Sequence, residues 1–145
     1  MADIVESNIE WNHGPAWSAK LEIGDRDIDH QHKRIFKFLN TLIESCKIND
    51  TKFAIEETLI YLVDYLLYHL AEEERTTRRY KYPKYVEHKQ MHDNFTVTVR
   101  DLTNEYEKNG DSETLFSAVN NRIVKWLIQH IQREDLKIAQ YIKRR

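Results

Sequence analysis

The sequence predicts an all-α protein folded as an up-down-up-down four-helix bundle. Three glycines and two prolines among 145 residues leave little material for the tight turns of β-hairpins. Long segments carry apolar residues at alternating steps of three and four, the period of a helix with one buried face. Short connections between these segments favour antiparallel neighbours. We expect a single domain over residues 1–145, with an N-terminal arm over about residues 1–26 that Trp11 and Trp17 anchor onto the bundle.

Each expected helix is bounded by residues that favour a helix end. Asp, Ser or Thr caps a start, proline is tolerated in a first turn, and glycine accepts the left-handed conformation at a C-terminus. The expected boundaries are Asp27–Cys46 for the first helix, Asp50 or Thr51 for the start of the second, Tyr82–Pro83 for the start of the third, Asn109–Gly110 for its end, and Asp111 or Ser112 for the start of the fourth.

Composition and charge exclude several classes of partner. The net charge of −2, with both signs mixed along the chain, gives no broad basic surface for nucleic acid. No apolar run has the length of a membrane span, and the first twenty residues contain no signal-peptide pattern. The single cysteine, Cys46, excludes an internal disulfide and fits a reducing compartment. We therefore expect a cytoplasmic protein, and a monomer.

Histidine and carboxylate side chains recur on the expected inward face of every helix. Residues four apart on a helix lie within about 40° of each other around its axis, so each such pair can point at one place. Two pairs have this spacing, His69 with Glu73 and His88 with His92. The full set of inward candidates is His32, His69, Glu73, His88, His92, His130 and Asp135.

A metal explains this set better than ordinary core packing does. A single histidine on a buried face is more often a hydrogen-bonded core residue than a ligand. Buried histidines and carboxylates each cost several kcal/mol unless they are paired or bind a metal. Seven such costs exceed the net stability of a domain, about 5 to 15 kcal/mol. Imidazole and carboxylate ligands suit iron, zinc, copper or nickel, and the set is too large for one ion.

The last helix needs an irregularity if its two candidates are to share a site. Five-residue spacing places His130 and Asp135 about 140° apart on a regular α-helix. We therefore predict that the helix breaks or loosens around Ile131–Glu134, with a short C-terminal helix beyond it. The remaining polar residues near these clusters are expected to be ordinary solvated groups: His13, His30, Glu72 and Glu74.

Taken together, the seven candidates resemble the ligand set of the hemerythrin family, in particular its prokaryotic single-domain branch. The flanking residues resemble that family too, over nearly the whole chain. They are Trp17, Leu21, Gly24, Ile28, Asp29 and Gln31 before the first ligand candidate, Tyr82–Pro83 before the third-helix pair, and Trp126–Leu127 before His130.

The resemblance implies a cofactor of two non-haem iron ions with an oxo or hydroxo bridge. His88, His92 and His130 would bind one iron, His32 and His69 the other, and Glu73 and Asp135 would bridge them. The implied function is reversible binding of dioxygen, for storage, transport or delivery, without enzymatic activity. Two alternatives stay open, an oxygen or nitric oxide sensor and a di-iron enzyme that reduces peroxide or nitric oxide.

The same resemblance indicates an oxygen pocket walled by Leu127, Trp126 and Leu70. Leu70 stands where the family usually has Phe, and Thr76 and Thr77 stand where it usually has Leu and Met. A smaller or more polar pocket rim would admit water and hasten loss of bound oxygen.

Overall fold

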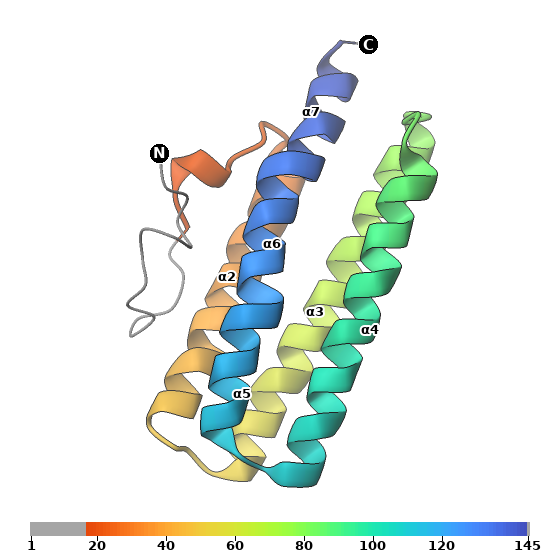
Figure 1. The fold of residues 1–145 in the computed structure, drawn as a ribbon. Coiled ribbons are helices and arrows are strands. Elements are labelled where there is room, and N and C mark those ends of the chain that lie inside the picture. The colour runs from red at the N-terminus through yellow and green to blue at the C-terminus, as the bar shows by residue number, and fades with distance from the viewer. Residues whose placement is uncertain (1–16, 145) are drawn as a thin grey trace.

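The computed structural model describes residues 17–144, which are helical apart from the connections, with no strand among them (Figure 1). The predicted all-α bundle is confirmed. A short 3-10 turn, η1, leads into three long helices, and a fourth helical run is assembled from several consecutive segments. The elements are η1 (Ala19–Leu21), α2 (Arg26–Lys47), α3 (Lys52–Arg79), α4 (Tyr85–Asn109), α5 (Ser112–Ala118), η2 (Val119–Val124), α6 (Lys125–His130), η3 (Ile131–Asp135) and α7 (Leu136–Lys143).

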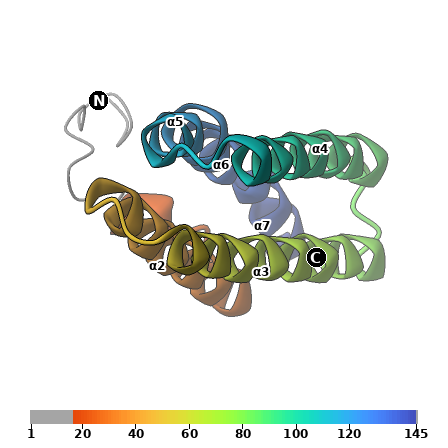
Figure 2. The ribbon, with the colours of Figure 1, turned by 90° about the horizontal axis from the view of Figure 1, so that it is seen from below.

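The four helical runs alternate in direction, and each packs against the next along the chain. α2 contacts α3, α3 contacts α4, and α4 contacts α5 and η2 of the fourth run. The fourth run also packs against α2, which closes the bundle into a ring of four (Figures 1 and 2). No helix in residues 17–144 is long and apolar enough to cross a membrane.

Two helices begin at the capping residues that the sequence predicts. Thr51 accepts a hydrogen bond from the Ala54 amide at the start of α3, and Asp111 caps α5 in the same way. Gly110 ends α4 with φ of +63°, a left-handed conformation that an L side chain rarely adopts. α4 begins at Tyr85, two residues after Pro83.

The buried stripes form one core along the bundle axis. The inward residues of α2 are all buried: Ile28, His32, Ile35, Leu39, Leu42 and Cys46. Those of α3 are buried too: Ile55, Leu59, Leu62, Leu66, His69 and Glu73. Tyr85, the first residue of α4, is only partly buried, and so is Phe116 on α5. Leu115, beside Phe116, is buried in its place. Trp17 packs edge-on against Phe36, with ring centroids 5.6 Å apart, whereas Trp11 lies outside the described residues.

The fourth run loosens where an irregularity was predicted, but it does not break. Residues Ile131–Asp135 form a π-helical turn, and α7 continues directly from it. A second π segment, Val119–Val124, lies before α6, and nothing in the sequence pattern predicts it. A π turn adds a residue to the turn and rotates the chain that follows it. Within α7, Ile138 is fully buried while Leu136 and Ile142 are partly buried.

Candidate metal centre

All seven candidate ligands meet inside the bundle, about midway between the four helical runs. They form two groups that share the carboxylates of Glu73 and Asp135. The larger group adds three histidines from α4 and α6, and the smaller adds one histidine from α2 and one from α3. None of the seven is more than 6% exposed. The larger group is Glu73, His88, His92, His130 and Asp135, and the smaller is His32, His69, Glu73 and Asp135.

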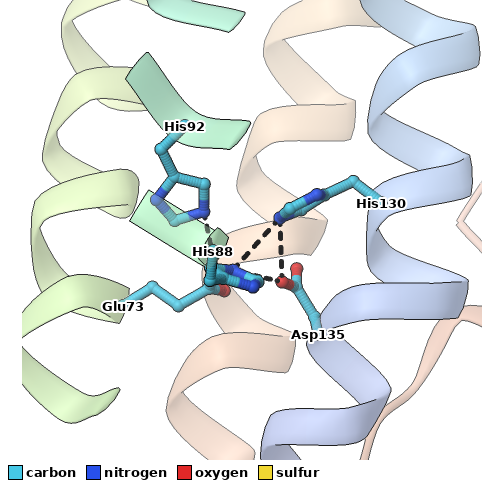
Figure 3. Close-up of side chains that lie close together, drawn as sticks. All are labelled: Glu73, His88, His92, His130 and Asp135. Atoms are coloured by element: carbon cyan, nitrogen blue, oxygen red, sulfur yellow. Dashed lines mark hydrogen bonds and ion pairs between the residues drawn. The ribbon is translucent and has the colours of Figure 1, made fainter. Parts of the chain in front are cut away.

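In the larger group, imidazole nitrogens converge on the two carboxylates (Figure 3). Oε1 of Glu73 lies 2.7 Å from Nε2 of His88 and 3.1 Å from Nε2 of His92. Oδ1 of Asp135 lies 3.3 Å from Nε2 of His88 and 3.2 Å from Nε2 of His130. The nitrogens of His88 and His130 face each other at 3.2 Å. Two imidazole nitrogens so placed repel unless a proton or a cation lies between them.

The smaller group reaches the second oxygen of each carboxylate. Nε2 of His32 lies 3.2 Å from Oδ2 of Asp135, and Nε2 of His69 lies 3.5 Å from Oε2 of Glu73. Each carboxylate therefore directs one oxygen to each group, which is the arrangement of a bridging ligand. Adjacent donors about 2.1 Å from one octahedral ion lie about 3 Å apart, close to these spacings.

Unsatisfied polar atoms support the fit to a metal. Among the described residues, five buried atoms at the centre have no hydrogen-bond partner: Nδ1 and Nε2 of His32, Oε2 of Glu73, and both carboxylate oxygens of Asp135. His32 Nε2 and Asp135 Oδ2 are close, yet their geometry is not that of a hydrogen bond. Unpaired buried atoms are costly in a protein interior, whereas coordination of a cation satisfies the four donor atoms other than His32 Nδ1.

The π turn brings the last two candidates into the same site. His130 ends α6 and Asp135 ends the π-helical segment, so the five-residue spacing spans little more than one wide turn. On a regular α-helix the Asp135 carboxylate would point about 140° away from His130. The local irregularity is therefore what places this carboxylate between the two groups.

Charge and burial act against each other on the ionisable groups. Burial lowers the pKa of His88, but its contacts with Asp135 and Glu73 raise it to about 10. Burial raises the pKa of Glu73, and so does the Asp135 charge, but hydrogen bonds from His88 and His92 lower it to about 2. Burial, with the nearby His32, lowers the pKa of His69 to about 4. The carboxylates are thus held as anions, as metal ligands must be.

Two polar residues next to the ligand candidates hold the far nitrogens of two histidines. Nδ1 of His69 donates to Oε1 of Gln31 at 2.7 Å, and Nδ1 of His92 donates to Oε2 of Glu74 at 3.0 Å. The expectation that Glu74 is solvated was wrong, because α4 packs on the side of α3 to which Glu74 points. The sequence shows that Glu74 follows Glu73, but it does not show which helix packs beside Glu74. Glu72 is partly exposed, lines the cleft between α2 and α3, and pairs with Arg75.

The residues of the predicted oxygen pocket lie near the centre, on α3 and α6. Leu127, one turn before His130, is 2% exposed, and Leu70, next to His69, is 5% exposed. Trp126 stacks on the imidazole of His130, with centroids 4.3 Å apart and planes 12° from parallel. Whether these side chains contact oxygen stays a prediction.

The two threonines do not present free hydroxyls to the centre. Thr77 is buried, and its hydroxyl donates to the backbone carbonyls of Glu73 and Glu74. Thr76 is partly buried and lines a separate cleft of about 600 Å³ between α2 and α3. His30 is exposed, as expected, and lines the same cleft, while His13 lies outside the described residues.

Comparison with known proteins agrees with the geometry. Residues 24–142 match the family described as the hemerythrin HHE cation binding domain. The chain is 29% identical over 127 residues to a bacteriohemerythrin of Stenotrophomonas maltophilia, covering 88% of this chain and 80% of that protein. It is 30% identical over 119 residues to a bacteriohemerythrin of Pseudomonas paraeruginosa, covering 82% and 75%. A hemerythrin-like protein of Naegleria gruberi is 26% identical over 121 residues, covering 83% and 87%. The chain therefore belongs to the hemerythrin family.

Proposed function

We propose that this protein binds dioxygen reversibly at a non-haem di-iron centre built from the seven clustered side chains. The observation that carries the proposal is the uneven division of histidines around two shared carboxylates, three on one side and two on the other. In this proposal His88, His92 and His130 bind one iron, and His32 and His69 bind the second. Glu73 and Asp135 bridge the two, since each directs one oxygen to each group.

The side with two histidines would leave a coordination position open. If two six-coordinate ions shared both carboxylates and one bridging oxygen, five imidazoles would occupy every remaining position but one. That position would fall beside His32 and His69, where the protein supplies one nitrogen fewer. Two ferrous ions held in this way supply electrons and one vacant position to a small ligand such as dioxygen.

We infer that apolar side chains close to the clustered histidines keep water away from the centre. Leu127 and Leu70 are both almost fully buried, and Phe95 and Trp126 stack with centroids 3.9 Å apart beside the His130 ring. An apolar surrounding of this kind disfavours charged species and proton transfer from solvent. We infer that these residues favour release of dioxygen as the neutral molecule over loss of electrons from the centre.

A role as a carrier or store fits the ligand chemistry better than an enzymatic one. Ferritin-like di-iron enzymes use a carboxylate-rich set with paired Glu-x-x-His motifs. In this chain five of the seven candidate ligands are histidines and only two are carboxylates. Members of the hemerythrin family are mainly oxygen-binding proteins without enzymatic activity. We propose the same here, in the cytoplasm and as a monomer.

The proposal is tested by anaerobic reconstitution with ferrous iron. We expect about two irons per chain, an optical spectrum that changes on admission of air, and recovery of the starting spectrum when oxygen is removed by argon. A stoichiometry near one, or zinc retained in preference to iron with no response to air, contradicts the di-iron assignment. If the starting spectrum returns only slowly, and peroxide or nitric oxide is consumed, the enzymatic alternative is favoured instead.

A further inference from the structure

Two adjacent glutamates on α3 direct their carboxylates to different places. Glu73 points into the bundle and contacts His88 and His92 through Oε1. Glu74, about 100° further around the helix, points towards α4, where Oε2 accepts the hydrogen bond from Nδ1 of His92. The Glu74 side chain is 20% exposed and the His92 side chain only 1%. This contact lies in the helix interface and not on an open surface.

Within the described residues, this arrangement is particular to one histidine. Apart from the two shared carboxylates, Glu74 is the one acidic group among residues 17–144 that lies within 4.0 Å of any of the five candidate histidines. The corresponding partner of His69 is the neutral amide of Gln31. The two halves of the centre therefore differ in charge beyond their immediate ligands. The half with three histidines has an anionic partner, and the half with two has a neutral one.

We propose that Glu74 is a positioning residue that sets the electron-donating strength of His92. Its carboxylate fixes the Nδ1–H tautomer of the imidazole, which leaves the Nε2 lone pair directed at the centre. The negative charge also polarises the imidazole, so Nε2 becomes a stronger donor to the metal beside it. Because a stronger donor favours the higher charge on a metal ion, Glu74 stabilises the oxidised state at the three-histidine position. This inference rests on the proposed di-iron function for its redox part.

A purely structural role for Glu74 makes different predictions. A contact between α3 and α4 that only holds the helices together contributes to folding and leaves the properties of bound metal unchanged. A partner that tunes His92 changes metal affinity and reduction potential, and it does so with a sign set by its charge. Exchanging charges at Glu74 and Gln31 separates these two possibilities.

The test compares the variants Glu74→Gln, Glu72→Gln and Gln31→Glu. Glu74→Gln keeps the size and a carbonyl acceptor but removes the charge. Glu72→Gln removes the same charge on the same turn from a residue that pairs with Arg75 and does not contact a histidine. Gln31→Glu adds a charge at the equivalent place beside His69. Each protein is measured for Co²⁺ affinity by competition with a chelator, and for the midpoint reduction potential of the iron-loaded form.

We expect Glu74→Gln to weaken Co²⁺ binding roughly tenfold or more, the usual effect of losing such a partner. Its midpoint potential should rise, that of Gln31→Glu should fall, and that of Glu72→Gln should match the parent. Equal behaviour of Glu74→Gln and Glu72→Gln in both measurements overturns the proposal. So does a Glu74→Gln protein that is less stable to urea but keeps the parent potential and affinity.

These outcomes are separable from failure of the proposed function. Co²⁺ binding does not involve oxygen, and affinity differences between variants are read even if the protein does not bind oxygen reversibly. A parent protein that fails to respond to air refutes reversible oxygen binding alone. A parent that responds to air, with no difference among the variants, refutes the role of Glu74 alone.

Discussion

His130 and Asp135 are five residues apart in the chain, yet Nε2 of His130 lies 3.2 Å from Oδ1 of Asp135. The π-helical turn Ile131–Asp135 makes this contact possible. Such turns are rare, because their wider hydrogen-bonding pattern is less favourable than that of a regular α-helix. Those that occur are frequently at functional sites. The turn thus brings Asp135, and not its neighbour Glu134, into the cluster beside Glu73.

Replacing Asp135 with Ala should weaken iron retention far more than replacing Glu134 with Ala. Asp135 is 1% exposed and contacts histidines of both groups, whereas Glu134 is partly exposed and pairs with Lys137. Loss of a partner outside the metal ligands costs ten- to a hundredfold in affinity, and loss of a bridging ligand should cost at least roughly that much. The measurement is the iron retained by each variant against a chelator. Retention by Asp135→Ala together with loss by Glu134→Ala contradicts the assignment.

The sequence was sufficient for the bundle and for the membership of the cluster. Inward positions repeat every three to four residues, so His69 and Glu73 fall on the same buried stripe as Leu62 and Leu66. The need for an irregularity after His130 also followed from spacing alone. The form of the irregularity did not, because a wide turn and a chain break satisfy the same spacing. The structure shows a wide turn, since α7 continues directly from it.

The partners outside the cluster could not be predicted in the same way. Gln31 and Glu74 reach histidines on other helices, 38 and 18 residues away in the chain. Their roles depend on which helices are neighbours and on the rotation of each about its axis. Periodicity separates inward from outward faces, but it does not identify the helix that covers a flank. For that reason Glu74 was predicted to be solvated.

The free energy of unfolding of the metal-free protein should be highest near about pH 6.5 and fall on either side. The pKa of His88 is raised from 6.5 to about 10, so its contribution is complete below pH 6.5 and lost as the pH rises to 10. The pKa of His69 is lowered from 6.5 to about 4, so its contribution is lost as the pH falls through that range. The pKa of Glu73 is lowered from 4.5 to about 2, and its contribution is lost over that more acidic range.

Urea denaturation in the presence of a chelator, repeated between pH 4 and pH 10, measures the part of this profile that the histidines determine. The variant His88→Asn should show a weaker decline on the alkaline side, because it lacks one of the groups whose raised pKa causes it. The raised pKa of His92 should preserve part of the decline. A parent protein whose stability increases from pH 7 to pH 10 contradicts the prediction.

Replacing Gln31 with Leu should weaken metal binding without unfolding the protein. The change leaves Nδ1 of His69 without its acceptor at 2.7 Å, so the imidazole is no longer held in one tautomer and orientation. We expect a ten- to a hundredfold loss of Zn²⁺ affinity, measured by competition with a chromophoric chelator. The matched control is Gln90→Leu, because Gln90 is exposed on α4 and bonds to Asn94. An equal loss of Zn²⁺ affinity in both variants would mean that general destabilisation causes it, and would contradict this prediction.

Replacing Leu127 with Asn should shorten the lifetime of the oxygenated protein. Leu127 is 2% exposed and lies one turn before His130, so a polar side chain there gives water a hydrogen-bonding partner beside the centre. Burying the amide costs about 1 to 3 kcal/mol, which a bundle of this size should tolerate. Leu127→Met is the control, since it keeps an apolar side chain of similar volume.

The decay of the oxygenated optical spectrum in air is followed for both variants, with circular dichroism to establish that each is folded. We expect faster decay for Leu127→Asn and near-parental decay for Leu127→Met. Equal decay in a folded Leu127→Asn variant shows that other residues keep water from the centre.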